Sequence, residues 1–263
     1  MSRYFLAFFI AMQITYHAPI FAVTEYASKH EEFAKCEWNS PAGGTLQYRQ
    51  YSPEVVEGEK YPLLIFLHGA GERGNDNQAQ LVHDEWMGFI FGEGGRKAYA
   101  IAPQCPANGK WNNVSWGNRE THETPEEPAD TLRMVREIVA EMKKTPAVDE
   151  TRIYITGLSM GGYGTFEYMV RWGDEIAAAM PVCGGADNEA LKKTESLRGM
   201  GIWVFHGDND GAVPVGRSRL AVEAMKEMNP EVKYTEFPGV GHDSWTPAYH
   251  TEGLWEWLAS QKR

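Results

Sequence analysis

Short apolar runs alternate with amphipathic segments along most of this chain, and the alternation limits its fold more than any other feature. Residues 63–67 (LLIFL) are apolar throughout, which is typical of a strand buried on both faces. Residues 131–143 instead place apolar side chains at helical spacing. Strands in alternation with helices predict an α/β fold, in which a mostly parallel sheet has helices on both faces. Further strands are expected at 98–102, 152–156, 176–182, 202–205 and 232–237, and further helices at 161–171, 217–228 and 251–260.

Two segments depart from this alternation. Residues 45–51 alternate apolar with polar side chains ahead of the first buried strand, and we expect them to form an antiparallel edge strand. The strand at 98–102 is expected to end at Pro103. Residues 104–127 have no periodicity and contain Pro, Asn, Gly and Thr, so they predict a long loop of the kind that is usually functional.

The first 22 residues combine a basic start with a short apolar run. The apolar run covers residues 4–12 and is shorter than the about 20 residues that a membrane span needs. Ala22 is a small residue suited to cleavage, although Ile20 is unusual two positions before such a point. This pattern predicts a secretory signal over 1–22, one domain over 23–263, and a secreted or periplasmic location. The alternative is a mobile or buried N-terminal segment.

Charge and cysteine content restrict the partners and the bonds that hold the fold. The formal net charge is −11, which disfavours nucleic acid and anionic membranes because phosphate binding needs Lys and Arg. No later segment is apolar enough to span a membrane. The three cysteines are Cys36, Cys105 and Cys183, so at least one is unpaired. Cys105 and Cys183 each follow a predicted strand, and two buried thiols are favoured there over a disulfide.

A G-x-S-x-G pattern, residues 157–161 (GLSMG), lies directly between a predicted strand and a predicted helix. In that position a tight turn projects the serine hydroxyl above the sheet, and the glycines avoid collisions with neighbouring backbone. The start of the following helix favours developing negative charge. The pattern therefore predicts Ser159 as a nucleophile rather than as part of a plain glycine-rich turn.

Residues 68–74 (HGAGERG) follow the first buried strand, where a loop supplies one donor of an oxyanion hole. We assign the two backbone N–H donors to Ala70 and Met160. The same residues also fit the G-x-G-x-x-G pattern of dinucleotide binding. That interpretation needs an acidic residue at the end of the next strand, and neither Asp84 nor Glu85 ends an apolar strand. It is therefore disfavoured, and no cofactor is expected.

An acid and a histidine follow the nucleophile in the order that a triad requires. Residues 206–214 (HGDNDGAVP) come after a predicted strand, and both Asp208 and Asp210 suit the task of orienting an imidazole. This Asp-x-Asp also fits a solvated turn or a cation site, but no further ligand spacing supports a metal. His242 lies after the last predicted strand, where it is expected to reach Ser159 as a general base.

Together, the motifs HGAGERG, GLSMGG, HGDNDGAVP and GHDSW, in this order, resemble the α/β-hydrolase superfamily. The closest resemblance is to secreted bacterial esterases of the feruloyl-esterase-like and polyhydroxybutyrate-depolymerase-like kinds, and to "predicted peptidases". The likeness covers about residues 45–258 and includes the APQCP segment at 102–106 and Trp245. It implies the α/β-hydrolase fold, and it places the triad acid on Asp210.

The resemblance and the motifs together predict a serine carboxylic ester hydrolase that works through an acyl-enzyme intermediate. The expected substrate is a small-molecule or polysaccharide-linked ester of the feruloyl or acetyl type. An alcohol leaves more readily than an amine, and no separate lid or propeller domain is visible that would select peptides. A serine peptidase of the prolyl-oligopeptidase-like type is the alternative, and a non-catalytic binding protein with this fold is a further one.

Tryptophans near the expected site are candidates for substrate binding. Trp111 and Trp116 lie in the long loop, and Trp245 follows His242 by three residues. Loops at the carboxyl ends of parallel strands meet where ligands bind. Indoles suit an aromatic acyl group or a sugar ring, so we expect Trp116 and Trp245 to contact substrate. The alternative is that these rings pack the loop onto the sheet.

Overall fold

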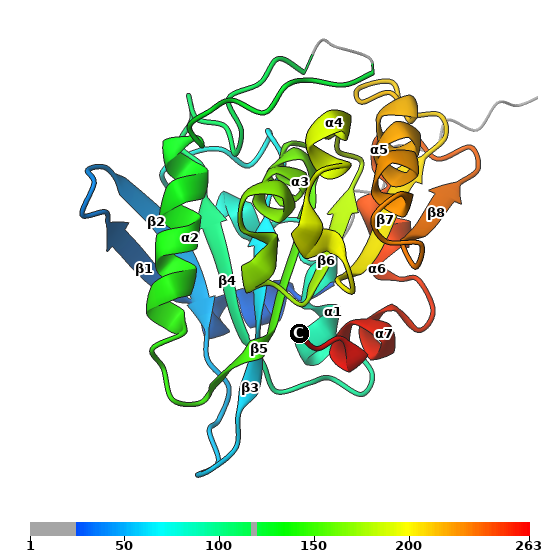
Figure 1. Cartoon of the computed structure of the whole chain (residues 1–263). Coiled ribbons are helices and arrows are strands. Elements are labelled where there is room, and N and C mark those ends of the chain that lie inside the picture. Colours follow the sequence, from blue (N-terminus) through cyan, green and yellow to red (C-terminus); the bar gives the residue numbers. More distant parts are fainter. Residues whose placement is uncertain (1–24, 117–119) are drawn as a thin grey trace, which may run out of the picture.

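A computed structural model of the protein describes residues 25–116 and 120–263 (Figure 1). The predicted signal over residues 1–22 lies outside the described residues. Within the described ranges, no helix combines the length and the apolar character that crossing a membrane requires. The cysteines Cys36, Cys105 and Cys183 are free, and the last two are buried, as the favoured prediction has it.

The described strands form one sheet in the order β1-β2-β4-β3-β5-β6-β7-β8. β1 and β2 pair antiparallel, as do β2 and β4, and every later pairing is parallel. The predicted mostly parallel sheet is therefore confirmed. The strands are β1 (Ala34–Asn39), β2 (Thr45–Tyr51), β3 (Tyr61–Leu67), β4 (Tyr99–Gln104), β5 (Val148–Leu158), β6 (Ala178–Val182), β7 (Gly201–Gly207) and β8 (Lys233–Phe237).

Helices cover both faces of this sheet, and each face has its own apolar core. Figure 1 shows α2, α3 and α5 over one face, where they pack with side chains of β3 such as Ile65. α1, α6 and α7 pack on the other face with Phe66. β3 alternates its side chains between the two cores, which explains its unbroken apolar run. The helices are α1 (Gly88–Phe91), α2 (Asp130–Met142), α3 (Met160–Trp172), α4 (Asn188–Leu191), α5 (Gly216–Lys226), α6 (Trp245–Tyr249) and α7 (Leu254–Ser260).

Three predicted elements differ from the structure. β2 is antiparallel but is not the edge strand, because β1 pairs along its outer side. β4 does not end at Pro103, because Pro103 stands opposite Tyr48 in the pairing with β2 and the strand continues to Gln104. α7 begins at Leu254 rather than at residue 251, because Gly253 has a left-handed φ of 73° that interrupts a helix.

The topology brings the chemical motifs to one edge of the sheet. β3 pairs with β5 in parallel, so the loop after Leu67 and the turn after Leu158 emerge side by side. β7 and β8 are parallel neighbours further along the sheet, and they carry the segments that hold Asp210 and His242. The carboxyl ends of the parallel strands therefore define the edge where a site is expected.

Candidate active site

Ser159 occupies a strained turn between β5 and α3. Its φ of 53° and ψ of −115° lie in a region that non-glycine residues rarely adopt. Such a conformation costs about 1–3 kcal/mol and is kept only where the surroundings enforce it. The N–H of Ser159 donates to the carbonyl of Val182 at 2.9 Å, and its own carbonyl accepts from Tyr163 N–H at 3.1 Å. The turn is thus fixed to β6 and to the first turn of α3.

The glycines on either side of Ser159 are required by close backbone contacts. A Cβ on Gly161 would lie 1.8 Å from the carbonyl oxygen of Leu67. A Cβ on Gly157 would lie 2.5 Å from the carbonyl oxygen of Gly161. Any side chain at either position would therefore push β5, β3 and α3 apart, which is the collision that the sequence pattern predicts.

His242 contacts both the serine and an aspartate. Its Nε2 lies 2.9 Å from Ser159 Oγ, and its Nδ1 lies 2.7 Å from Asp210 Oδ2. A carboxylate only accepts hydrogen bonds, so Nδ1 donates to Asp210 and Nε2 is left to accept from the serine hydroxyl. The imidazole is 30% exposed, whereas the Asp210 carboxylate is completely buried. This is the geometry of a nucleophile, its base and the acid that orients the base.

The Asp210 carboxylate is held in its charged form. Burial alone would raise the pKa of Asp210, but hydrogen bonds from His206, His242 and the Val213 N–H outweigh burial and keep this pKa well below its usual range. Oδ1 accepts from the N–H groups of Ala212 and Val213 at 2.8 and 2.9 Å. The carboxylate therefore stays ionised across the pH range in which a histidine titrates.

Of the two candidate aspartates, only Asp210 contacts His242 among the described residues. Asp208 is exposed, and its Oδ1 accepts from the N–H of Gly239 at 2.7 Å. That bond ties the turn after β7 to the turn after β8. Asp208 thus positions the loop that carries His242 without touching the imidazole.

The predicted oxyanion loop runs directly against the serine. A Cβ on Gly69 would lie 3.7 Å from Ser159 Cβ and 2.8 Å from Leu158 Cδ1, so the backbone there approaches the turn closely. Met160 is the first residue of α3, and its N–H has no partner within the helix. The N–H groups of Ala70 and Met160 thus belong to segments that meet at Ser159, which is where an oxyanion hole requires its donors.

His68 and Trp111 hold this loop in place, a role that the sequence motifs did not indicate. His68 is buried, its Nε2 accepts from Cys105 N–H at 2.9 Å, and its carbonyl accepts from Trp111 Nε1 at 2.9 Å. Burial lowers the pKa of His68 to about 4, so the ring is neutral. Trp111 is fully buried, so this indole packs the long loop onto the sheet instead of lining a cleft.

The other two candidate tryptophans contact different residues near Ser159 and His242. The Trp245 ring meets the His242 ring edge to face, with centroids 5.6 Å apart, and also contacts His83 at 4.9 Å. The centroid of the Trp116 ring lies 6.4 Å from that of Tyr163, a residue of α3 that is one helical turn beyond Ser159. Both indoles are partly buried, and Trp116 Nε1 has no hydrogen-bond partner among the residues that the structure describes. The structure thus places Trp245 against the His242 ring and Trp116 against the helix that follows Ser159.

Cys183 also lies beside the triad, a position that no motif indicated. Its sulfur and nearby atoms of Asp210 and His242 lie within 4.8 Å of one another, a spacing that would suit a metal ion. Burial raises the pKa of the Cys183 thiol to about 12, so the sulfur stays protonated and is a poor ligand. Asp210 and His242 are already bonded to each other. We therefore infer no metal here.

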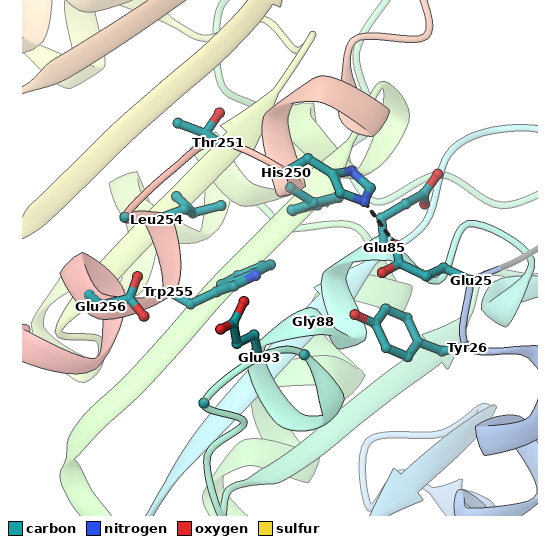
Figure 2. Close-up of a pocket in the computed structure, with 14 residues that line it drawn as sticks. Glu25, Tyr26, Glu85, Gly88, Glu93, His250, Thr251, Leu254, Trp255 and Glu256 are labelled. Carbon is teal, nitrogen blue, oxygen red and sulfur yellow. Dashed lines mark hydrogen bonds and ion pairs between the residues drawn. The ribbon is translucent and has the colours of Figure 1, made fainter.

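The cavity drawn in Figure 2 lies apart from this site. It has a volume of about 520 Å³, and none of the triad residues lines it. Figure 2 shows carboxylates, Glu25 and Glu93 among them, facing the space together with Trp255. Glu25 is bonded to His250 at 2.8 Å. A second cavity of similar volume lies in the long loop and includes Val114, which packs on Tyr163 in α3. The second cavity is therefore the nearer of the two to α3, the helix that begins directly after Ser159, through the contact of Val114 with Tyr163.

Comparison with known families adds an independent line of evidence. The sequence profile of the phospholipase/carboxylesterase family matches residues 52–250, which include β3 and all three triad positions. A bifunctional acetylxylan esterase/xylanase of Neocallimastix patriciarum is 30% identical over 149 residues, which cover 57% of this chain and 19% of that protein. A poly(3-hydroxyalkanoate) depolymerase C of Paucimonas lemoignei is 26% identical over 161 residues, covering 59% and 35% respectively.

The fold matches a solved esterase across most of the chain. The crystal structure of a thermostable esterase superimposes with a TM-score of 0.80 and 36% identity, over 89% of this chain and 64% of that one. The chain therefore spans about a fifth and about a third of the two curated relatives, and under two thirds of the solved structure. The predicted α/β-hydrolase resemblance is confirmed, with esterases among the similar proteins.

Proposed function

Because the chain belongs to the phospholipase/carboxylesterase family of α/β-hydrolases, we propose that it is a serine esterase in which Ser159, His242 and Asp210 form the catalytic triad. The observation that carries this proposal is the position of His242. It bridges a strained, partly exposed serine and a buried carboxylate at 2.9 and 2.7 Å. A purely structural histidine would not need both contacts at the carboxyl end of the sheet.

The chemistry follows from which atoms donate and accept. Ser159 Oγ attacks the carbonyl carbon of the ester, and its proton passes to His242 Nε2. Negative charge that develops on the carbonyl oxygen is met by the N–H groups of Ala70 and Met160. Asp210 stabilises the imidazolium, which then gives its proton to the departing alcohol. Water then attacks the carbonyl carbon of the acyl-enzyme with His242 as its base, and the carboxylic acid leaves Ser159. No cofactor takes part in the proposed reaction.

The substrate we propose is a small-molecule or polysaccharide-linked ester, of the acetyl or feruloyl type. One similar protein is named as an acetylxylan esterase and another as a poly(3-hydroxyalkanoate) depolymerase, and both names describe esters. Trp245 packs against His242 and Trp116 against Tyr163, and these are the side chains that we propose to contact the bound ester. A net charge of −11 disfavours polyanionic partners. We further propose that the protein is exported, with residues 1–22 as the signal.

The test compares the wild-type protein and Ser159→Ala on p-nitrophenyl acetate, a feruloyl ester and a short peptide p-nitroanilide. We expect ester hydrolysis by the wild type, with little on the peptide, and only residual hydrolysis by the variant. Peptide hydrolysis that exceeds ester hydrolysis would favour a serine peptidase. A variant as active as the wild type would contradict the proposed nucleophile.

A further inference from the structure

A second histidine contacts the carboxylate of Asp210, and the reaction above does not use it. His206 lies in β7 and is fully buried. Its Nε2 lies 3.2 Å from Asp210 Oδ2, the same oxygen that His242 Nδ1 approaches at 2.7 Å. The carboxylate therefore stands between two imidazoles, one buried and one partly exposed.

The hydrogen-bond partners of His206 fix which nitrogen carries its proton. Nε2 faces two acceptors, the Asp210 carboxylate and the carbonyl oxygen of Val213, the latter at 3.0 Å. Neither group can donate, so the proton is on Nε2. Nδ1 lies 2.7 Å from Ser218 Oγ in α5. In the neutral ring this nitrogen accepts, so the Ser218 hydroxyl donates to it at 2.7 Å in preference to the Gly184 carbonyl oxygen, which lies 3.5 Å from Ser218 Oγ.

We propose that Ser218 and His206 form a second, buried Ser–His pair that positions the triad acid. The contacts then run from Ser218 through His206, Asp210 and His242 to Ser159. His206 is a positioning residue, because it acts on the reaction only through the carboxylate. The inference rests on the proposed function, since it assigns a role within the same triad.

The count of donors shows what His206 contributes. Oδ1 of Asp210 accepts two backbone N–H groups, and Oδ2 accepts from His242 Nδ1–H and lies 3.2 Å from His206 Nε2, whose N–H also faces the Val213 carbonyl oxygen. A carboxylate has sites for about four hydrogen bonds, so three are filled and His206 lies at the fourth. Rotation of the carboxylate would break the bonds to Oδ1 and move Oδ2 away from both imidazoles, so His206 adds to the contacts that fix the direction of His242 Nδ1–H.

Three other ionisable groups near this chain of contacts are either paired or neutral. Glu236 stands opposite His206 in β8 and is paired with Arg219 at 2.6 Å. Tyr163 and Cys183 face Asp210, and burial raises the pKa of both side chains, so each stays neutral. His206 and His242 are thus the side chains that act on the charge of Asp210.

The test is a double-mutant cycle with p-nitrophenyl acetate as substrate. His206→Leu keeps a similar volume but removes the donor, whereas the amide of His206→Gln presents an N–H near the position of Nε2. Loss of one hydrogen bond to a charged acceptor predicts a fall in kcat of about tenfold to a hundredfold for the Leu variant, with KM nearly unchanged. We expect the Gln variant to recover most of this loss. In an Asp210→Asn background, His206→Leu should lower kcat no further.

The inference would be overturned if His206→Leu lowered kcat by the same factor in the wild-type and Asp210→Asn backgrounds. It would also be overturned if kcat of His206→Gln were no higher than that of His206→Leu. Ser218→Ala removes a single oxygen and is measured in the same two backgrounds, so the cycle stands even if the Leu variant does not fold. His30→Leu is the matched control, because His30 also bonds a buried aspartate, Asp84, at 2.9 Å. It should leave kcat unchanged. Wild-type activity in Ser159→Ala would instead overturn the proposed function itself.

Discussion

His242 Nε2 lies 2.9 Å from Ser159 Oγ, although the two residues are 83 positions apart in the chain. Three parallel strands, β6, β7 and β8, separate them in sequence, and the turns after β5 and β8 bring them together at the carboxyl end of the sheet. The contact depends on the sheet order, on the strained turn at Ser159 and on the loop that holds His242. Each of these can be tested by a substitution.

The two aspartates of the DND turn should respond differently to substitution. Asp210→Asn is expected to lower kcat by about 10⁴, because the amide no longer fixes the right tautomer of the histidine. Asp208→Asn keeps an oxygen that can accept from Gly239 N–H, and this side chain does not touch the imidazole, so we expect a small effect on kcat. Steady-state kinetics of both variants give the ranking, and a larger loss in Asp208→Asn would show that the acid is misassigned.

Gly161→Ala should damage both stability and activity. Its Cβ would lie 1.8 Å from the carbonyl oxygen of Leu67, so β3 and α3 must separate. Such overpacking typically costs about 1–3 kcal/mol or more, and the turn at Ser159 shifts with it. The matched control is Gly216→Ala, where an added Cβ meets nothing within 4 Å. Thermal unfolding and activity of both variants are the measurements, and similar melting temperatures would contradict the contact.

Stability should fall as the pH drops, because His68 is buried in its neutral form. Burial lowers the pKa of His68 in the folded protein to about 4, from an ordinary value of 6.5. Between pH 6.5 and 4 the unfolded chain binds a proton at His68 and the folded chain does not. The contribution of His68 to the free energy of unfolding is therefore complete above pH 6.5 and declines between pH 6.5 and 4. The slope is about 1.4 kcal/mol per pH unit. Urea unfolding of the wild type and His68→Gln at pH 7, 6 and 5 measures it, and parallel pH dependences would exclude His68 as its source.

Trp245→Ala should affect bulky esters more than acetyl esters. The indole lies against the His242 ring at the proposed active site, and loss of an aromatic contact costs about 0.5–1.5 kcal/mol, or roughly twofold to tenfold in kcat/KM. Trp257→Ala is the comparison, because Trp257 packs on Trp203 and not on the triad. A uniform loss across substrates with a large fall in melting temperature would make Trp245 a packing residue.

Much of the fold could be predicted because burial leaves a periodic signal in the sequence. β3 and α2 were recognisable since one is apolar on both faces and the other on a single face. β1 was missed although Ala34, Cys36 and Trp38 alternate with polar residues, and none of its side chains is buried in the way that marks β3. The extension of β4 through Pro103 depends on its antiparallel partner β2, which local sequence does not reveal.

The candidate site could be predicted only as far as its motifs extend. Ser159, Asp210 and His242 each stand in a local pattern tied to a strand end. His206 stands in the same motif as Asp210, but its contact with the carboxylate depends on the direction of a buried side chain. The burial of Trp111 likewise depends on tertiary packing against His68, so spacing alone left its role open.

The most direct test of the account is covalent labelling of the nucleophile. A fluorophosphonate reacts with a serine activated by a neighbouring base, and the adduct can be located by mass spectrometry of the digested protein. We expect one adduct per chain, on Ser159, with loss of ester hydrolysis in proportion to labelling and no adduct in Ser159→Ala. Stoichiometric labelling of a different residue, or full activity after Ser159 is labelled, would contradict the account.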